Sequence, residues 1–180
     1  MKLLTLLFVC AISIAACNPQ SVEKKPTEQV EAKNDGKSLD LPYKLARIPD
    51  WEKGDDNNVP IAMKFLKSYE DKDFVGMRNY LADSVQFIYD NGNFSGTADQ
   101  MVKFLKNFRD ARQTVRIEMN DYESVRSKTR NQEYVSLWYN EHIVDNAGKA
   151  DSAFVMDDYR IKNGKISMID TKFRHLRNAN

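Results

Sequence analysis

Residues 134–173 read YVSLWYNEHIVDNAGKADSAFVMDDYRIKNGKISMIDTKF, and they carry the clearest strand pattern of the chain. Apolar and polar side chains alternate in three runs, at residues 134–144, 152–161 and 166–173, as expected of strands with one buried face. Two turn sequences separate the runs: Asn146-Ala147-Gly148 is typical of a three-residue hairpin loop, and Asn163-Gly164 of a two-residue turn. The stretch therefore predicts three antiparallel strands in a meander.

The two turns also predict which residues face each other across the strands. The first turn places Leu137 opposite Asp157, and the second places Asp157 opposite Asp170. Asp157 is then a carboxylate on an otherwise apolar face, about 5 Å from a second carboxylate. Burial and repulsion should raise one of the two pKa values, which predicts an acid beside a base, with Tyr139 as a diagonal hydrogen-bond donor.

Asp157, Asp170 and Tyr139 are therefore the candidate catalytic residues. The same pairing predicts that Asp170→Asn relieves repulsion and stabilises the domain near neutral pH. Three alternatives stay open. Asp170 is solvated near the rim of the sheet, a bulge breaks the register, or Asp157 caps a loop amide or pairs with an arginine.

Three helices are expected before the meander. The first carries the stripe Ala62, Phe65, Leu66 and Tyr69, and a short second helix follows Asp73. The third begins at Thr97, which forms a capping box with Gln100. Its buried stripe is Met101, Phe104, Leu105 and Phe108, and its basic residues Lys103, Lys106 and Arg109 are expected on a solvated face.

A strand with alternating Val85, Phe87 and Tyr89 is expected between the second and third helices. A further strand is expected around Val115, Ile117 and Met119, before the meander. The order of helix, helix, strand, helix and strands predicts an α+β layer fold.

This order resembles the nuclear transport factor 2-like superfamily, in particular its SnoaL-like branch. The resemblance rests on LADSV at 81–85, GT at 96–97 and DYRIKNGKI at 158–166, and it extends over roughly residues 58–175. It implies a cone-shaped, strongly curved antiparallel sheet wrapped around three N-terminal helices, with an apolar pocket inside. The wall of that pocket would be formed by Phe65, Leu66, Leu81, Phe87, Tyr89, Phe104, Tyr139 and Tyr159.

Two enzyme types of the superfamily are similar to this chain at Asp157. Ketosteroid isomerases carry a protonated aspartate there, and limonene epoxide hydrolases use two aspartates that Asp157 and Asp170 resemble. The chain departs from both patterns. Phe65 stands where the isomerases have a tyrosine, and Val155 stands where the hydrolases have an arginine.

Composition excludes several classes of function. The 180 residues include 27 Lys+Arg and 26 Asp+Glu, so no basic excess favours nucleic acid as a partner. Cys10 and Cys17 are the only cysteines, and His142 and His175 the only histidines, so neither a disulfide framework nor a metal centre is predicted. The sequence has no Gly-rich phosphate loop or nucleophile elbow, and no cofactor is predicted.

The first residues, MKLLTLLFVCAISIAAC, predict where the protein is localised. A short positive start and an apolar run too short to span a bilayer are typical of a signal peptide. Residues 14–17, IAAC, resemble the bacterial lipobox, in which the cysteine is lipidated and becomes the mature N-terminus. The alternative is an ordinary cleavage site before a cysteine. We therefore expect a signal peptide at 1–16, a lipidated Cys17 with a flexible tether to 57, and a domain at 58–176, anchored in the bacterial cell envelope at the outer membrane.

Two apolar features outside the predicted pocket are candidates for contacts with partners. Residues 39–51 include Leu39, Leu41, Tyr43 and Trp51 within the polar tether, and we expect them to lie extended along the domain or to bind a partner. Trp138 is expected as an exposed aromatic on the outer sheet face, where it would mark a homodimer interface. His142 is expected as a surface residue of the same face.

Three functions are compatible with these patterns. The first is a lipid-anchored protein whose cone-shaped domain binds a small apolar or amphipathic molecule. The second is an enzyme of isomerase or hydrolase type with the pair Asp157 and Asp170 as acid and base. The third is an assembly module of an envelope complex, without catalysis.

Overall fold

The computed structural model describes residues 33–34, 37–38, 40–47 and 49–176, and the chain divides into two units at Ile48 and Pro49. The two cysteines and the predicted signal peptide lie outside the described residues. The first unit contains the short antiparallel strands β1 (Lys33–Asn34) and β2 (Lys37–Ser38), and its Leu41 and Tyr43 are exposed. Within the described ranges, no helix has both the length and the apolar character needed to cross a membrane.

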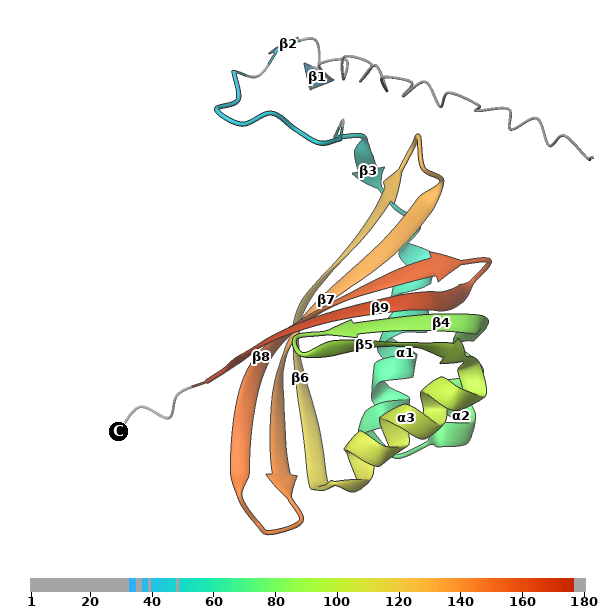
Figure 1. Cartoon of the computed structure of the whole chain (residues 1–180), viewed down its shortest axis with the longest axis vertical. Coiled ribbons are helices and arrows are strands. Elements are labelled where there is room, and N and C mark those ends of the chain that lie inside the picture. Colours follow the sequence, from blue (N-terminus) through green and yellow to red (C-terminus); the bar gives the residue numbers. More distant parts are fainter. Residues whose placement is uncertain (1–32, 35–36, 39, 48, 177–180) are drawn as a thin grey trace, which may run out of the picture. The chain divides into compact units, whose positions relative to one another are not determined.

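The second unit is an α+β domain, as predicted (Figure 1). Its elements are β3 (Trp51–Lys53), the 3-10 helix η1 (Asp56–Asn58), α1 (Val59–Glu70), α2 (Phe74–Arg78), β4 (Leu81–Tyr89), β5 (Gly92–Thr97), α3 (Ala98–Asp110), β6 (Arg112–Ser127), β7 (Gln132–Asp145), β8 (Ala150–Lys162) and β9 (Lys165–His175). Seven strands form one sheet in the order β3-β6-β7-β8-β9-β4-β5. The sheet is not wholly antiparallel, because β4 pairs with β9 in parallel.

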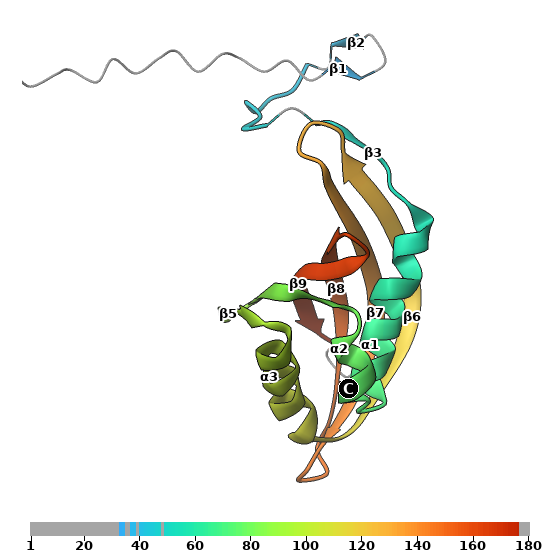
Figure 2. The same cartoon turned by 90° about the vertical axis from the view of Figure 1, so that its right-hand side faces the viewer.

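Figures 1 and 2 show that the long strands of this sheet are strongly bowed. The helices pack on the face where every second side chain is apolar, since the buried residues of β8 are Ala153, Val155, Asp157, Tyr159 and Ile161. From the helices, Ala62, Phe65, Leu66, Met101 and Leu105 complete the core. The amphipathic stripes expected in α1 and α3 therefore contribute to the core, except that Phe108 of the expected α3 stripe is 41% exposed.

The predicted capping box at the start of α3 is confirmed, because Thr97 and Gln100 each bind the backbone N–H of the other. The prediction for Arg109 is wrong: this side chain is only 5% exposed and is not part of a solvated face. Its guanidinium donates to the carbonyl oxygens of Tyr69, Glu70 and Arg112. Arg109 thereby joins the end of α1 to the start of β6.

The register of the first hairpin is confirmed, with Leu137 opposite Asp157. The register of the second is wrong beyond the turn, because a bulge shifts the pairing of β8 and β9. Ile166 pairs with Ile161, Met168 pairs with Arg160, and Ser167 is the extra residue between them. The bulge buries both Ile166 and Ile169, which a regular alternation cannot do.

The bulge separates the two predicted catalytic aspartates. Asp157 lies opposite Thr171, whereas Asp170 lies opposite Asp158, on the outer face of the sheet. There Lys172 neutralises the carboxylates, with its Nζ 2.9 Å from Asp158 and 3.0 Å from Asp170. The proposed pair of acid and base at Asp157 and Asp170 is therefore not formed.

Asp170→Asn is consequently expected to destabilise the domain slightly, by about 0–1 kcal/mol, since it removes half-exposed ion-pair contacts with Lys172. The loss should shrink when salt is added, because salt screens such pairs. Urea unfolding of both proteins at low and high salt measures the effect. A clear stabilisation near neutral pH would instead restore the paired-aspartate interpretation.

The domain begins at Pro49, earlier than the predicted Asn58, because β3 pairs with β6. Asp50 fixes this edge: it accepts hydrogen bonds from the side chains of Ser127 and Thr129 and forms an ion pair with Arg130. The bond from Ser127 is the main cause that lowers the pKa of Asp50. The sequence composition of residues 49–57 is that of a loop, and the pairing partner that orders them lies more than 60 residues away.

Candidate functional site

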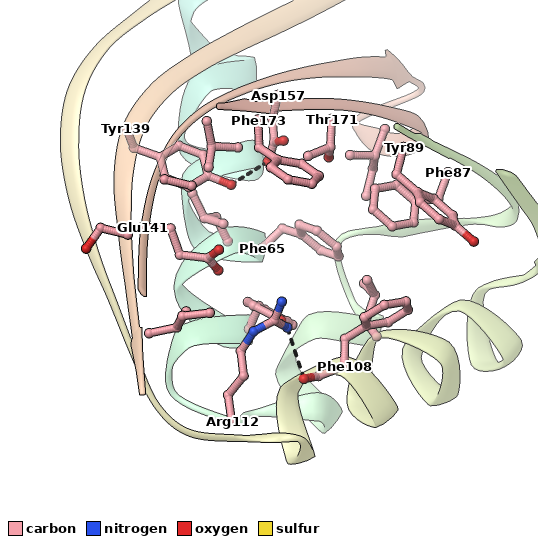
Figure 3. Close-up of a pocket in the computed structure, with 18 of the residues that line it drawn as sticks. Phe65, Phe87, Tyr89, Phe108, Arg112, Tyr139, Glu141, Asp157, Thr171 and Phe173 are labelled. Atoms are coloured by element: carbon pink, nitrogen blue, oxygen red, sulfur yellow. Dashed lines mark hydrogen bonds between the residues drawn. The ribbon is translucent and has the colours of Figure 1, made fainter. Parts of the chain in front are cut away.

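A cavity of about 260 Å³ lies between α1, α3 and the strands β4, β7, β8 and β9. Figure 3 shows it, with aromatic rings on several sides and polar side chains from the sheet and from the start of β6. The residues labelled there are Phe65, Phe87, Tyr89, Phe108, Arg112, Tyr139, Glu141, Asp157, Thr171 and Phe173.

Most of the predicted pocket residues lie at this cavity. Those that line it are Phe65, Leu66, Phe87, Tyr89, Tyr139 and Tyr159. Leu81 is not among the lining residues and belongs to the core, at 2% exposed. Phe104 also lies outside the lining, with its ring stacked on Phe94 at 4.8 Å between centroids and close to Phe87 and Tyr89.

Asp157 is the most buried acidic side chain of the cavity wall, at 4% exposed. Its Oδ2 accepts two hydrogen bonds, from the hydroxyl of Tyr139 at 2.8 Å and from that of Tyr159 at 2.6 Å. The bond from Tyr139 was predicted from its diagonal position, whereas Tyr159 was expected only as part of the apolar wall. The other oxygen, Oδ1, is shielded from solvent and has no hydrogen-bond partner within residues 49–176.

Burial decides the protonation of this group. It raises the pKa of Asp157, and the hydroxyls of Tyr159 and Tyr139 that bind Oδ2 only partly offset the effect. Burial also raises the pKa values of Tyr139 and Tyr159 well above the usual range, so both remain donors at neutral pH. A carboxyl group in this state holds a proton more readily than an exposed aspartate does.

Arg112, Glu141, Asp151 and His175 also line the cavity and were not predicted to do so, and Asp151 contacts His175 at 3.0 Å. Glu141 lies on β7 on the same face as Tyr139, and Arg112 is the first residue of β6. Burial raises the pKa of Glu141, an effect that the positive charge of Arg112 opposes. Glu141 has the inward parity of Leu137 and Tyr139, so its position could have been found from the alternation alone. No sequence signal marks Arg112.

Thr171 takes the place at the cavity that the sequence assigned to Asp170. His142 lies on the outer face, as expected, with its Nδ1 2.9 Å from the Ser152 hydroxyl. Trp138 is half-buried and not the exposed aromatic that was expected, because its indole N–H donates to the sulfur of Met156 at 2.8 Å. Across the described chain, no group of three or more His, Cys, Asp or Glu residues could hold a metal ion.

Neither a protein-family model nor the sequence of a curated protein matches the chain. Solved structures match its fold. A nuclear transport factor 2-like protein of unknown function from Burkholderia pseudomallei K96243 superposes with a TM-score of 0.56 at 14% identity, covering 67% of this chain and 92% of that one.

Two further structures are similar to the same extent. An LEH-like epoxide hydrolase from M. tuberculosis has a TM-score of 0.54 at 11% identity, covering 65% of this chain and 82% of its own. TerC, co-crystallised with polyporic acid, has a TM-score of 0.54 at 11% identity, with 65% and 91% covered. At these identities the similarity shows the fold, and the domain has the nuclear transport factor 2-like fold that the sequence predicted.

Proposed function

We propose that this chain is a lipid-anchored protein of the bacterial cell envelope whose cone-shaped domain binds a small amphipathic molecule. The observation that carries the proposal is the cavity between the helices and the sheet, which combines aromatic walls with ionisable side chains. Such a combination is typical of small-molecule sites, where apolar surface supplies affinity and a few polar groups fix orientation.

The size of the cavity limits the ligand. At about 260 Å³ it exceeds the roughly 150 Å³ of an apolar cavity that admits benzene, and lies just below the common range of ~300–1,000 Å³. A molecule of one or two rings therefore fits. The crystallisation of TerC with polyporic acid supports a small-molecule role for this fold.

Binding can be tested with 2-naphthol as a probe and a soluble form of the chain, residues 18–180, which lacks the proposed signal peptide and Cys17. We expect chemical-shift changes at Phe65, Tyr139 and Tyr159, and we expect Ala153→Phe to abolish them, because Ala153 lines the cavity and a phenyl ring fills it. Met156→Phe is the matched control on the outer face of the same strand and should leave binding unchanged. Shifts that persist in Ala153→Phe would place the probe elsewhere and contradict the proposal.

The anchor is supported by the lipobox-like residues before Cys17. Cys17→Ser removes the thiol that receives lipid, so we expect the chain to lose acyl label and to leave the membrane fraction of a bacterial host. Mass spectrometry of the N-terminal peptide measures both cleavage and acylation. Cleavage before residue 17 in the wild type without any added lipid would contradict the proposed lipid anchor and indicate an ordinary signal peptide.

A further inference from the structure

Besides Asp157, the cavity has a second polar region, which is formed by the side chains of Arg112 and Glu141. In Figure 3 the guanidinium of Arg112 and the carboxylate of Glu141 project into the cavity, and in this view Phe65 lies between Arg112 and Asp157. Asp157 is poorly placed to bind a ligand directly. Its Oδ2 already accepts two hydrogen bonds and its Oδ1 is shielded from solvent.

Arg112 is held in position by several contacts. Its Nη1 donates to the Tyr69 hydroxyl at 2.8 Å and to the Phe108 carbonyl at 3.0 Å, while its own carbonyl accepts from Arg109 at 2.9 Å. These bonds occupy one nitrogen of the guanidinium. The Nε and Nη2 atoms donate to no other residue of the domain as described, so they remain available to a ligand.

Glu141 offers the complementary chemistry. Its carboxylate comes from β7, the strand that pairs with β6, and accepts no hydrogen bond within the described part of the chain. The two side chains are near enough for the charge of Arg112 to lower the pKa of Glu141, yet they form no ion pair in the described domain. A ligand group can therefore lie between donors on one side and an acceptor on the other.

We propose that Arg112 and Glu141 together bind a neutral amide group of the ligand, such as a primary carboxamide or a lactam. The amide carbonyl accepts from Arg112 and the amide N–H donates to Glu141. This inference rests on the proposed function and narrows it to one chemical class of ligand.

Charge balance favours an amide over a carboxylate or an amine. Asp151 and His175 also line the cavity, but they contact each other at 3.0 Å and their side chains are 40% and 63% exposed to solvent. The charges of Arg112 and an ionised Glu141 cancel, so a neutral group with a donor and an acceptor satisfies both without adding charge. A ligand carboxylate would face Glu141, and a ligand ammonium would face Arg112. Either would leave a net charge in a largely buried site, where uncompensated charge is costly.

Four probes with the same phenyl ring test this directly: benzamide, benzoate, benzylammonium and toluene. Each is titrated into the soluble form of the chain, residues 18–180, and the dissociation constant is read from chemical shifts of cavity residues. We expect benzamide to bind about tenfold more tightly than toluene, the effect of roughly one net hydrogen bond, and more tightly than either charged probe.

Glu141→Gln should reverse the order of two probes, because it leaves the charge of Arg112 uncompensated. We expect benzoate to overtake benzamide, with a change of about tenfold or more in their ratio. Glu118→Gln, on the neighbouring strand and 58% exposed at its side chain, is the matched control and should not change the ratio. Melting temperatures of both variants check that the fold is kept.

Three outcomes overturn the inference. Benzoate as the tightest probe of the wild type would make this an anion site with a protonated Glu141. A ratio unchanged by Glu141→Gln would show that Glu141 does not contact the probe. Toluene binding as tightly as benzamide would remove the polar subsite while leaving the proposed function intact, whereas failure of all four probes to bind would count against both.

Discussion

Replacing Asp157 by alanine is expected to lower the free energy of unfolding by about 2–4 kcal/mol, measured by urea denaturation. The hydroxyls of Tyr139 and Tyr159 share the Oδ2 atom of this residue as their acceptor, and both tyrosines are buried. Alanine leaves two buried donors unpaired, and each such group costs about 1–3 kcal/mol. Relief of the buried carboxyl offsets part of this loss.

Two controls separate the acceptor from the charge. Asp158→Ala, at the adjacent position on the outer face, removes only partly exposed contacts with Ser136 and Lys172 and should cost about 1 kcal/mol or less. Asp157→Asn keeps an oxygen acceptor and should lose clearly less stability than Asp157→Ala. Equal losses in these two variants at Asp157 would show that charge, and not the acceptor, matters at this position.

Comparison of the wild type with Asp157→Asn tests how the free energy of unfolding depends on pH. Because burial raises the folded-state pKa of Asp157 above the unfolded value of about 3.9, the folded state binds more protons between the two values. The stability due to Asp157 is therefore fully present below the unfolded pKa and is lost as the pH rises through the folded one. Relative to Asp157→Asn, the wild type should become less stable over that interval, and the opposite slope would contradict a raised pKa.

Arg109→Met is expected to cost about 2–4 kcal/mol, although the residue lies on a helix that otherwise presents lysines to solvent. Its guanidinium donates to carbonyl oxygens at the end of α1 and at the start of β6, and hydrogen bonds from charged donors contribute about 1.5–3 kcal/mol each. Methionine preserves the length and apolar stem of the side chain but satisfies none of these carbonyls.

Lys103→Met is the matched control, because Lys103 is exposed on the same helix and should change stability by no more than about 0.5 kcal/mol. Urea unfolding with a fitted slope for each variant distinguishes a true loss of stability from a change in cooperativity. A cost for Arg109→Met as small as that of the control would mean that water replaces the guanidinium at those carbonyls.

The strands and helices could be predicted because their signals are local. Alternation located β7, β8 and β9, and Thr97 with Gln100 located the start of α3. The register of the first hairpin also followed from its turn, since Gly148 adopts the left-handed conformation that the loop requires. Strand β5 was missed, because its residues GNFSGT have little strand propensity and are ordered by pairing with β4.

The candidate site was predictable only in part, for two physical reasons. The bulge at Ser167 allows both Ile166 and Ile169 to be buried, and the turn sequence gives no sign of it. The inward position of Arg112 depends on contacts with Tyr69 and Phe108, on two different helices. Periodicity describes one element at a time, whereas these positions are decided between elements.

The bulge at Ser167 also makes the composition of the cavity sensitive to chain length. It sets the parity of every later residue of β9, so that Ile169, Thr171 and Phe173 line the cavity while Asp170 does not. A one-residue insertion or deletion shortly after Ser167 would turn the side chains of Ile169, Thr171 and Phe173 to the outer face and the side chains between them to the cavity. An apolar wall could thus become a charged one without a single substitution, and proteins of this fold can diverge in ligand preference through small changes in length.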